Sequence, residues 1–177
     1  MAANKRTDLA HFTCYTDGSL LNPDASAIMG AGWVFVGSHT EDARGCVGLR
    51  NWPSSTKAKL TAILMALCSV PSNSRCSIYT DSQAAIDGIK QLMSLGDSWK
   101  WNKLSNNNIK AAIRLLYGLK NISVDLIKMK EHSNDTYNDI ADLLAKRRAS
   151  EGSEGDFLFD LNSFTFSLIS SSVIVIL

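Results

Sequence analysis

The sequence predicts one α/β domain built on a mixed sheet, and two observations support that prediction. Three segments rich in β-branched and aromatic residues come first, and helices and strands then alternate along the chain. This order is typical of an antiparallel meander that continues into parallel strands. The length of 177 residues, with 45% hydrophobic and 20% charged residues, suits one domain with a core.

Each element follows from its local pattern. The first strand ends at a glycine, and a hairpin around "SHTED" joins the second strand to the third. Apolar residues at the i, i+3, i+4 and i+7 spacing predict helices, and short apolar runs between polar turns predict the later strands. The expected elements are strands at 11–18, 30–37 and 43–50, a helix at 53–67, a strand at 76–81, helices at 82–95 and 109–120, a strand at 122–129 and a helix at 134–149.

The two ends of the chain differ from this body. We expect residues 1–11 to form an N-terminal extension, 12–149 the domain, and 150–177 a linker and an apolar tail. "SEGSEGD" has a linker composition, and serines interrupt the apolar run after it. That interruption favours an added strand, or a remnant of a neighbouring domain, over a membrane anchor.

Composition limits the cellular context. The net charge of +1 gives no overall signal of a polyelectrolyte partner. The four cysteines form no CxxC pair and lie in apolar stretches, which suggests reduced thiols in an intracellular protein. The first ten residues lack the apolar run of a secretion signal. These observations leave the choice between cytoplasm and nucleus open.

Three aspartates occupy positions, at strand ends or beside apolar residues, where a carboxylate suggests a specific role. Asp17 is expected to close the first strand and Asp81 the fourth, and the carboxyl ends of neighbouring parallel strands form a ligand-binding crevice. Asp142 lies beside apolar residues of the last helix. A shared cation would offset the repulsion among such carboxylates. Taken singly, Asp17 could be a turn residue, Asp81 a helix cap, and Asp142 the i+4 partner of Lys146.

The helix expected at 53–67 begins with the wrong charge. Lys57 and Lys59 occupy its first turns, where the helix dipole favours acidic residues. Lys59 lies four residues before Ile63, so it borders the face that packs inward. An ammonium at that position therefore suggests a charged partner.

Several motifs follow one another along the chain: "YTDGS", a glycine-bearing hairpin with Trp33, "SST-A-LTAI", "YTDSQAAI" and "KMKEHS…NDIADLLAK". Together they resemble the type 1 ribonuclease H domain, in the form carried by retrotransposon reverse transcriptases. They occur in family order from Phe12 to Arg148, with ten residues from His132 to Asp142. The resemblance implies a ribonuclease H-like fold, a five-stranded mixed sheet whose first three strands are antiparallel, flanked by helices.

The resemblance also implies an activity and a metal site. The family hydrolyses the RNA strand of an RNA/DNA hybrid, with two divalent ions on the scissile phosphate. Mg²⁺ suits such a carboxylate site, and Mn²⁺ is an alternative. Of the four acids that hold the ions, three match Asp17, Asp81 and Asp142, and the fourth position, a Glu in the family pattern, is Lys59. His132 matches a histidine that assists product release or proton transfer.

Lys59 should weaken metal binding and impair hydrolysis. It leaves three carboxylates with an ammonium that repels divalent ions, unless the side chain swings toward solvent or takes one ion's place.

Other positions imply contacts with the hybrid. Residues 90–130 hold eight basic and two acidic residues with interleaved tryptophans, a footprint of nucleic-acid binding or else a solvated helical surface. The "DSQ" motif implies minor-groove contacts, where 2′-hydroxyls distinguish RNA from DNA. Hydroxyls and amides at loop and helix starts could meet phosphates or serve as caps. The expected substrate-binding residues are Asn22, Ser54, Ser55, Thr56, Ser82, Gln83, Lys100, Lys103 and Asn138.

Three functions stay open at this point. The chain could be a ribonuclease H with impaired activity, a non-catalytic module that binds RNA/DNA hybrids, or a decayed retrotransposon fragment. Its partner would be an RNA/DNA hybrid rather than a membrane, with other domains of a retrotransposon polyprotein as further candidates.

Overall fold

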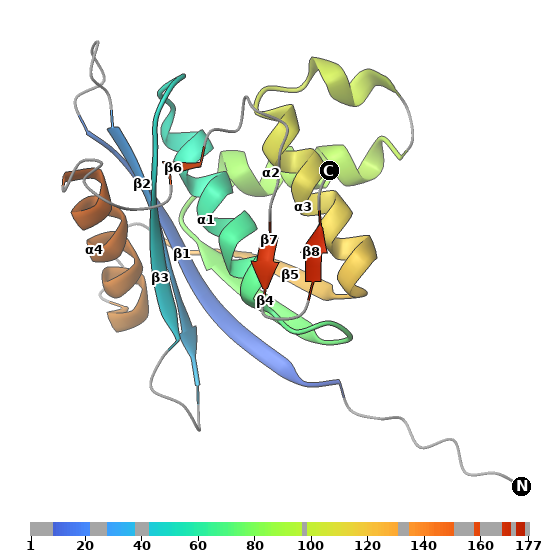
Figure 1. Ribbon diagram of the computed structural model, residues 1–177, viewed down its shortest axis with the longest axis horizontal. Coiled ribbons are helices and arrows are strands. Elements are labelled where there is room, and N and C mark those ends of the chain that lie inside the picture. Colours follow the sequence, from blue (N-terminus) through green and yellow to red (C-terminus); the bar gives the residue numbers. More distant parts are fainter. Residues whose placement is uncertain are drawn as a thin grey trace, which may run out of the picture.

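The structure is a computed structural model of the chain. It describes residues 9–21, 28–37, 43–96, 99–130, 135–150, 158–159, 168–170 and 173–175. Three layers are visible, with a sheet between one helix on one side and three helices on the other (Figure 1).

The sheet is mixed, in the order β5-β4-β1-β2-β3. The first three strands pair antiparallel, whereas β4 runs parallel to β1 and β5 runs parallel to β4. These strands are β1 (His11–Leu21), β2 (Ile28–Val36), β3 (Arg44–Leu49), β4 (Arg75–Thr80) and β5 (Ser123–Lys128). The five-stranded mixed sheet predicted from the sequence is therefore confirmed.

The chain adds three short strands after residue 150. β6 (Leu158–Phe159) pairs parallel with β3, and β7 (Leu168–Ser170) pairs antiparallel with β8 (Val173–Val175). Within the described ranges, no helix has the length and apolar character needed to cross a membrane.

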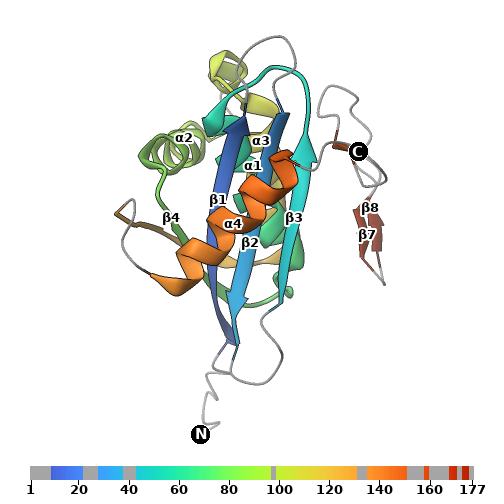
Figure 2. The ribbon, with the colours of Figure 1, turned by 90° about the vertical axis from the view of Figure 1, so that its left-hand side faces the viewer.

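Helices cover both faces of the sheet. α4 lies across β1, β2 and β3 on one face (Figure 2), and α1 to α3 lie on the other. The helices are α1 (Ser55–Ser69), α2 (Gln83–Ser94), the short 3-10 helix η1 (Trp99–Lys103), α3 (Asn107–Lys120) and α4 (Thr136–Ser150).

The main core lies between the sheet and α1. The predicted apolar face of α1 is confirmed, because its four residues are each 2% exposed or less: Leu60, Ile63, Leu64 and Leu67. On the opposite face, glycine lets α4 approach the sheet closely. A Cβ at Gly32 would lie only 2.4 Å from the carbonyl oxygen of Ala141. None of the four cysteines, all of which lie in the described residues, forms a disulfide.

One predicted boundary is wrong in a way that concerns the site. β1 does not end at Gly18 but continues to Leu21, because its antiparallel partner β2 pairs with it as far as Leu21 and Ile28. Asp17 therefore lies inside β1 rather than closing it.

Candidate active site

Asp17 and Asp81 lie at the same edge of the parallel part of the sheet. The register between β1 and β4 ends with Thr16 opposite Thr80, and each aspartate is the next residue along its strand. β4 stops there, and Ser82 begins α2 by accepting a hydrogen bond from the backbone N–H of Ala85 at 3.1 Å. The predicted convergence of the two aspartates is explained by this register.

A close approach of α1 brings Lys59 to the same edge. A Cβ at Gly18 would lie 2.4 Å from the backbone nitrogen of Lys59, so glycine is required where β1 passes α1. The Lys59 Nζ then lies 3.0 Å from Asp17 Oδ1, and 2.5 Å and 2.6 Å from the two carboxylate oxygens of Asp81. Asp17, Lys59 and Asp81 form what we call the acid–ammonium cluster.

The cluster is mostly shielded from solvent. The side chains of Asp17, Asp81 and Lys59 are 10%, 12% and 16% exposed. Burial raises the pKa of Asp17 to about 6, the Lys59 ammonium opposes that shift, and the Asp81 carboxylate adds to it. Burial alone would lower the pKa of Lys59, but its hydrogen bonds and charge interactions with both carboxylates raise that pKa overall. Lys59 is therefore a cation in the folded domain.

Asp142 does not join this cluster. Its carboxylate accepts a hydrogen bond from Lys146 Nζ at 2.7 Å, so the i+4 pairing considered from the sequence is present. The packing face expected beside it is present only in part. Leu143 is 65% exposed, whereas the Cβ of Leu144 lies against Gly32, and α4 packs mainly through the small side chains of Ala141 and Ala145.

The side chains of the acid–ammonium cluster, in the arrangement seen here, do not fit a divalent ion. Among the residues that the structure describes, no three acidic, histidine or cysteine side chains lie close enough together to hold a metal. Carboxylate oxygens are suitable ligands for Mg²⁺, but those of Asp17 and Asp81 already contact an ammonium.

The other expected site residues have varied surroundings. Asn22 and His132 lie outside the described residues. Ser82 is 8% exposed and serves as a cap, and the Gln83 amide donates to Asp87 on the exposed surface at 2.8 Å. Asn138 is 7% exposed, and its side-chain carbonyl oxygen has no hydrogen-bond partner among the residues that the structure describes. Lys100 and Lys103 are exposed in η1.

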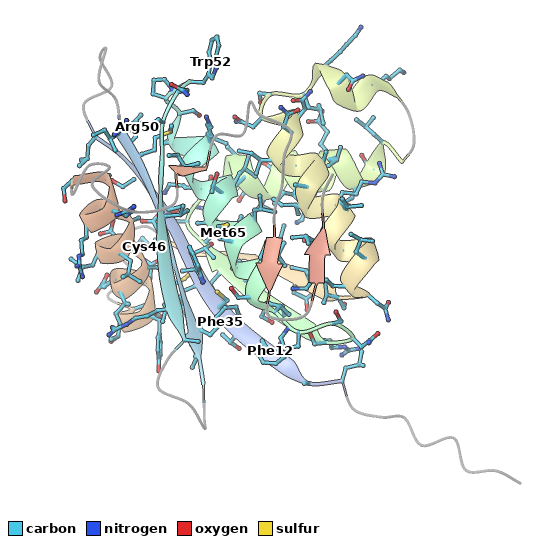
Figure 3. The ribbon with its side chains drawn as sticks, in the orientation of Figure 1. Phe12, Phe35, Cys46, Arg50, Trp52 and Met65 are labelled. Atoms are coloured by element: carbon cyan, nitrogen blue, oxygen red, sulfur yellow. The ribbon has the colours of Figure 1, made fainter. Side chains whose placement is uncertain are left out.

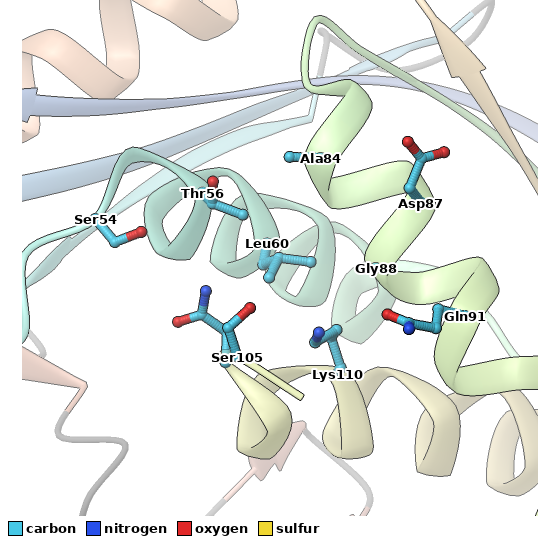
Figure 4. Close-up of a pocket in the computed structure, with 10 residues that line it drawn as sticks. Ser54, Thr56, Leu60, Ala84, Asp87, Gly88, Gln91, Ser105 and Lys110 are labelled. Atoms are coloured by element: carbon cyan, nitrogen blue, oxygen red, sulfur yellow. The ribbon is translucent and has the colours of Figure 1, made fainter. Parts of the chain in front are cut away.

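A pocket of about 500 Å³ lies where α1 and α3 begin, next to α2 (Figure 4). Ser54 caps α1 there by accepting from the backbone N–H of Lys57 at 3.3 Å, and Asn106 precedes α3 without a side-chain cap. The pocket is lined by Ser54, Thr56, Leu60, Ala84, Asp87, Gly88, Gln91, Ser105, Asn106 and Lys110. Two helix N-termini and Lys110 favour an anion in this pocket, whereas the Asp87 carboxylate in its lining disfavours one.

Lys110 is a residue that sequence reasoning missed. It is 3% exposed, burial lowers its pKa, and its ammonium has no partner among the described residues. It points toward the pocket from α3 in Figure 4. A lysine next to Ile109 and three residues before Ile113, both buried, was the available signal.

Comparisons with known proteins agree with this fold and this order of motifs. A family model described as RNase H matches residues 10–150. Ribonuclease H of Wolbachia sp. subsp. Drosophila simulans (strain wRi) is 29% identical over 140 residues, which cover 75% of this chain and 91% of the relative. Ribonuclease HI of Xylella fastidiosa (strain 9a5c) is 27% identical over 139 residues, which cover 76% and 89%.

Two solved structures share the fold at low sequence identity. LC9-RNase H1, a type 1 RNase H with the type 2 active-site motif, aligns with a TM-score of 0.63 and 17% identity, over 83% of this chain and 75% of that chain. A foamy viral protease-reverse transcriptase in complex with dsDNA aligns with a TM-score of 0.60 and 24% identity, over 79% and 94%. The sheet order, the helices on its two faces and the family match over residues 10–150 lead to one conclusion: this chain belongs to the RNase H family.

Proposed function

We propose that this domain binds RNA/DNA hybrids and hydrolyses their RNA strand at a rate that Lys59 keeps low. Hydrolysis of the RNA strand of a hybrid is the general activity of the RNase H family. The observation that supports a low rate is the bidentate contact of Lys59 with Asp81, at 2.5 Å and 2.6 Å, together with its 3.0 Å contact with Asp17.

Lys59 lowers the rate because it competes with the cations that the family's chemistry uses. RNase H enzymes generally depend on divalent metal, which supplies an activated water and stabilises the leaving oxygen when bound. At a distance of about 4 Å, an ammonium and a divalent ion would repel by several kcal/mol at an effective dielectric constant of about 20. Lys59 contacts both carboxylates, whereas the family pattern implied by the resemblance has a glutamate at this position.

Hybrid binding does not depend on that competition. The pocket with Ser54, Thr56 and Lys110 offers helix N-termini and an ammonium to a backbone phosphate. Lys100 and Lys103 are exposed in η1 and add to the basic surface. We further propose that the domain originates from a retrotransposon reverse transcriptase, with other domains of that polyprotein as its partners. The shared fold with the foamy viral protease-reverse transcriptase agrees with that origin.

Lys59→Glu tests the proposed role of Lys59. The change removes the ammonium and supplies a carboxylate, so cleavage of the hybrid's RNA strand in Mg²⁺ should rise by about two orders of magnitude or more. Lys59→Gln removes the charge without adding a ligand and should gain much less. Asp81→Asn in the Lys59→Glu background should abolish the gain, which excludes a contaminating nuclease. If the natural protein already cleaves as fast as Lys59→Glu, the proposed role of Lys59 is wrong.

The acid–ammonium cluster also favours a second candidate, a hybrid-binding module without catalysis. The two candidates differ in one measurement, cleavage by the natural protein compared with its Asp81→Asn variant. Cleavage above the level of that variant supports the enzyme. No cleavage, together with tighter binding of hybrid than of duplex DNA in fluorescence anisotropy, supports the module. Neither cleavage nor preferential binding would indicate a decayed fragment.

A further inference from the structure

An exposed tryptophan stands on strained backbone between β3 and α1. Trp52 is 75% exposed and has a φ of 51°, and its neighbour Asn51 has a φ of 61°. The Trp52 side chain projects away from the body of the domain (Figure 3). Asparagine tolerates this left-handed region, but a bulky residue such as tryptophan rarely adopts it. Pro53 follows directly, and a residue before proline favours extended backbone instead. Trp52 is therefore held in a conformation that its own preferences oppose.

A buried lysine fixes this turn. Lys57, in the first turn of α1, is 7% exposed, and its Nζ donates to the carbonyl oxygens of Asn51 at 2.7 Å and Arg50 at 3.4 Å. An ammonium that folds back onto two successive carbonyls restricts the backbone that carries the indole. Strain of this kind persists where the surrounding structure over-determines it, and it clusters at functional sites.

Packing does not explain the tryptophan. With three quarters of its surface in solvent, Trp52 contributes little to the core, and a glycine or asparagine would adopt the same φ with less strain. A rigid aromatic side chain exposed in polar and basic surroundings is the kind of surface on which nucleobases stack. The surroundings here are Arg50, which is exposed, and the hydroxyl of Ser54, which lines the pocket at the start of α1.

The position also agrees with contact to the same nucleic acid. Trp52 precedes the α1 cap by two residues, and the helical rise of about 1.5 Å per residue places the backbone of Lys59 about 6 Å along the axis from Ser55. Trp52 and the acid–ammonium cluster are therefore both close to the start of α1 along the helix axis.

We propose that Trp52 is a stacking platform for a nucleobase of the hybrid, at the edge of the candidate active site. This inference rests on the proposed function, since it takes the hybrid as the ligand. Stacking reads no base identity, so Trp52 should add affinity without adding sequence preference.

Binding of a fluorescent RNA/DNA hybrid to Trp52 variants tests the proposal. Trp52→Ala should weaken binding about tenfold, whereas Trp52→Phe should stay within about threefold of the natural protein. Leu119→Ala is the matched control, because Leu119 is also an exposed apolar residue, at 59%, but lies on α3 away from this turn. The salt dependence should not change in Trp52→Ala, because a lost stacking contact releases no counterions.

Trp52→Gly separates a binding role from a structural one. Glycine adopts a φ of 51° without strain, so this variant should bind as weakly as Trp52→Ala while its unfolding midpoint rises by a few degrees. A lowered midpoint would show that the indole supports the fold, and would overturn the proposal.

The remaining outcomes keep the two proposals distinct. If the natural protein binds hybrids and Trp52→Ala binds within twofold of it, the stacking role is wrong and the proposed function stands. If the natural protein binds no hybrid, both fail. If it forms dimers by analytical ultracentrifugation that Trp52→Ala abolishes, and hybrid affinity is unchanged, the indole serves a protein interface instead.

Discussion

Lys59→Met should destabilise the domain, because it removes the ammonium that directly contacts two shielded carboxylates. Methionine keeps the unbranched apolar stem of lysine, so the main change is the loss of contacts of 3.0 Å with Asp17 and 2.5–2.6 Å with Asp81. Removing one partner of a buried ion pair costs about 3–5 kcal/mol. Because these side chains are 10–16% exposed, water screens part of the charge, and we expect a loss of about 2–4 kcal/mol at pH 8.

The pH dependence of this loss has a definite sign. The pKa of Asp17 is about 6 in the folded domain against an ordinary value of 3.8, so the folded state binds more protons between these values. Stability should therefore decrease as pH rises through that window, by about 3 kcal/mol for this group. Lys59 lowers the folded-state pKa of Asp17, so its removal should raise the upper pH limit of this window. The cost of Lys59→Met should accordingly shrink as pH falls toward 4.

Urea denaturation at several pH values between about 4 and 8 measures both effects. The buffer should contain a chelator, since a divalent ion could replace the missing ammonium. Lys59→Arg keeps the charge and should lose much less stability, and Lys90→Met removes an exposed lysine of α2 and should change stability by less than about 0.5 kcal/mol. A cost for Lys59→Met that equals that of Lys90→Met, or that does not vary with pH, would refute the argument.

Two further predictions concern the nucleic-acid surface and the fold. Replacing Lys100 and Lys103 together with alanine should weaken hybrid binding and reduce the slope of log affinity against log salt by about 2, as anisotropy across a salt series would measure. Gly32→Ala should destabilise the domain by about 3 kcal/mol or more, because its Cβ would meet a backbone oxygen of α4 at 2.4 Å. Gly118→Ala is the control, since nothing lies within 4 Å of its Cβ and helical alanine is favoured there.

The sheet and the helices could be predicted because local pattern and chain order suffice for them. Alternation and apolar runs identify strands, and the face formed by Leu60, Ile63, Leu64 and Leu67 identifies α1. The end of β1 could not be predicted, because the pairing of Leu21 with Ile28 depends on the partner strand and not on Gly18. The glycine predicted the end of the strand at a point where the pairing with the neighbouring strand continues.

The site was predictable in part. The positions of Asp17 and Asp81 at one edge follow from the strand order, but the contact with Lys59 depends on how closely α1 approaches Gly18, which is a tertiary property. Asp142 was placed beside leucines because periodicity favours large apolar residues. The actual packing face of α4 is alanine, since the helix lies against glycines of β2. Small residues such as alanine give only a weak indication of a packing face in the sequence.

The roles of two lysines became visible only in three dimensions. In the sequence, Lys57 stood out as a basic residue at a helix start and Lys110 as one of the basic residues of 90–130. Their burial, at 7% and 3% exposure, shows that Lys57 fixes a turn and that Lys110 lines a pocket. Trp52 drew no attention as a single aromatic residue. Its exposure and its positive φ are what make it unusual.

We expect residue 59 to place stability and catalysis in opposition. Two carboxylates at one edge of a sheet require a positive charge, and this chain supplies that charge from α1 rather than from solution. The fold then needs no ion, because the ammonium already offsets the repulsion between Asp17 and Asp81. A lysine is a single charge on a flexible stem, so it can offset part of the charge of the pair but cannot polarise a phosphate on two sides as two divalent ions do. The same contact that stabilises the folded domain in the absence of metal is therefore what we expect to keep its hydrolytic activity low.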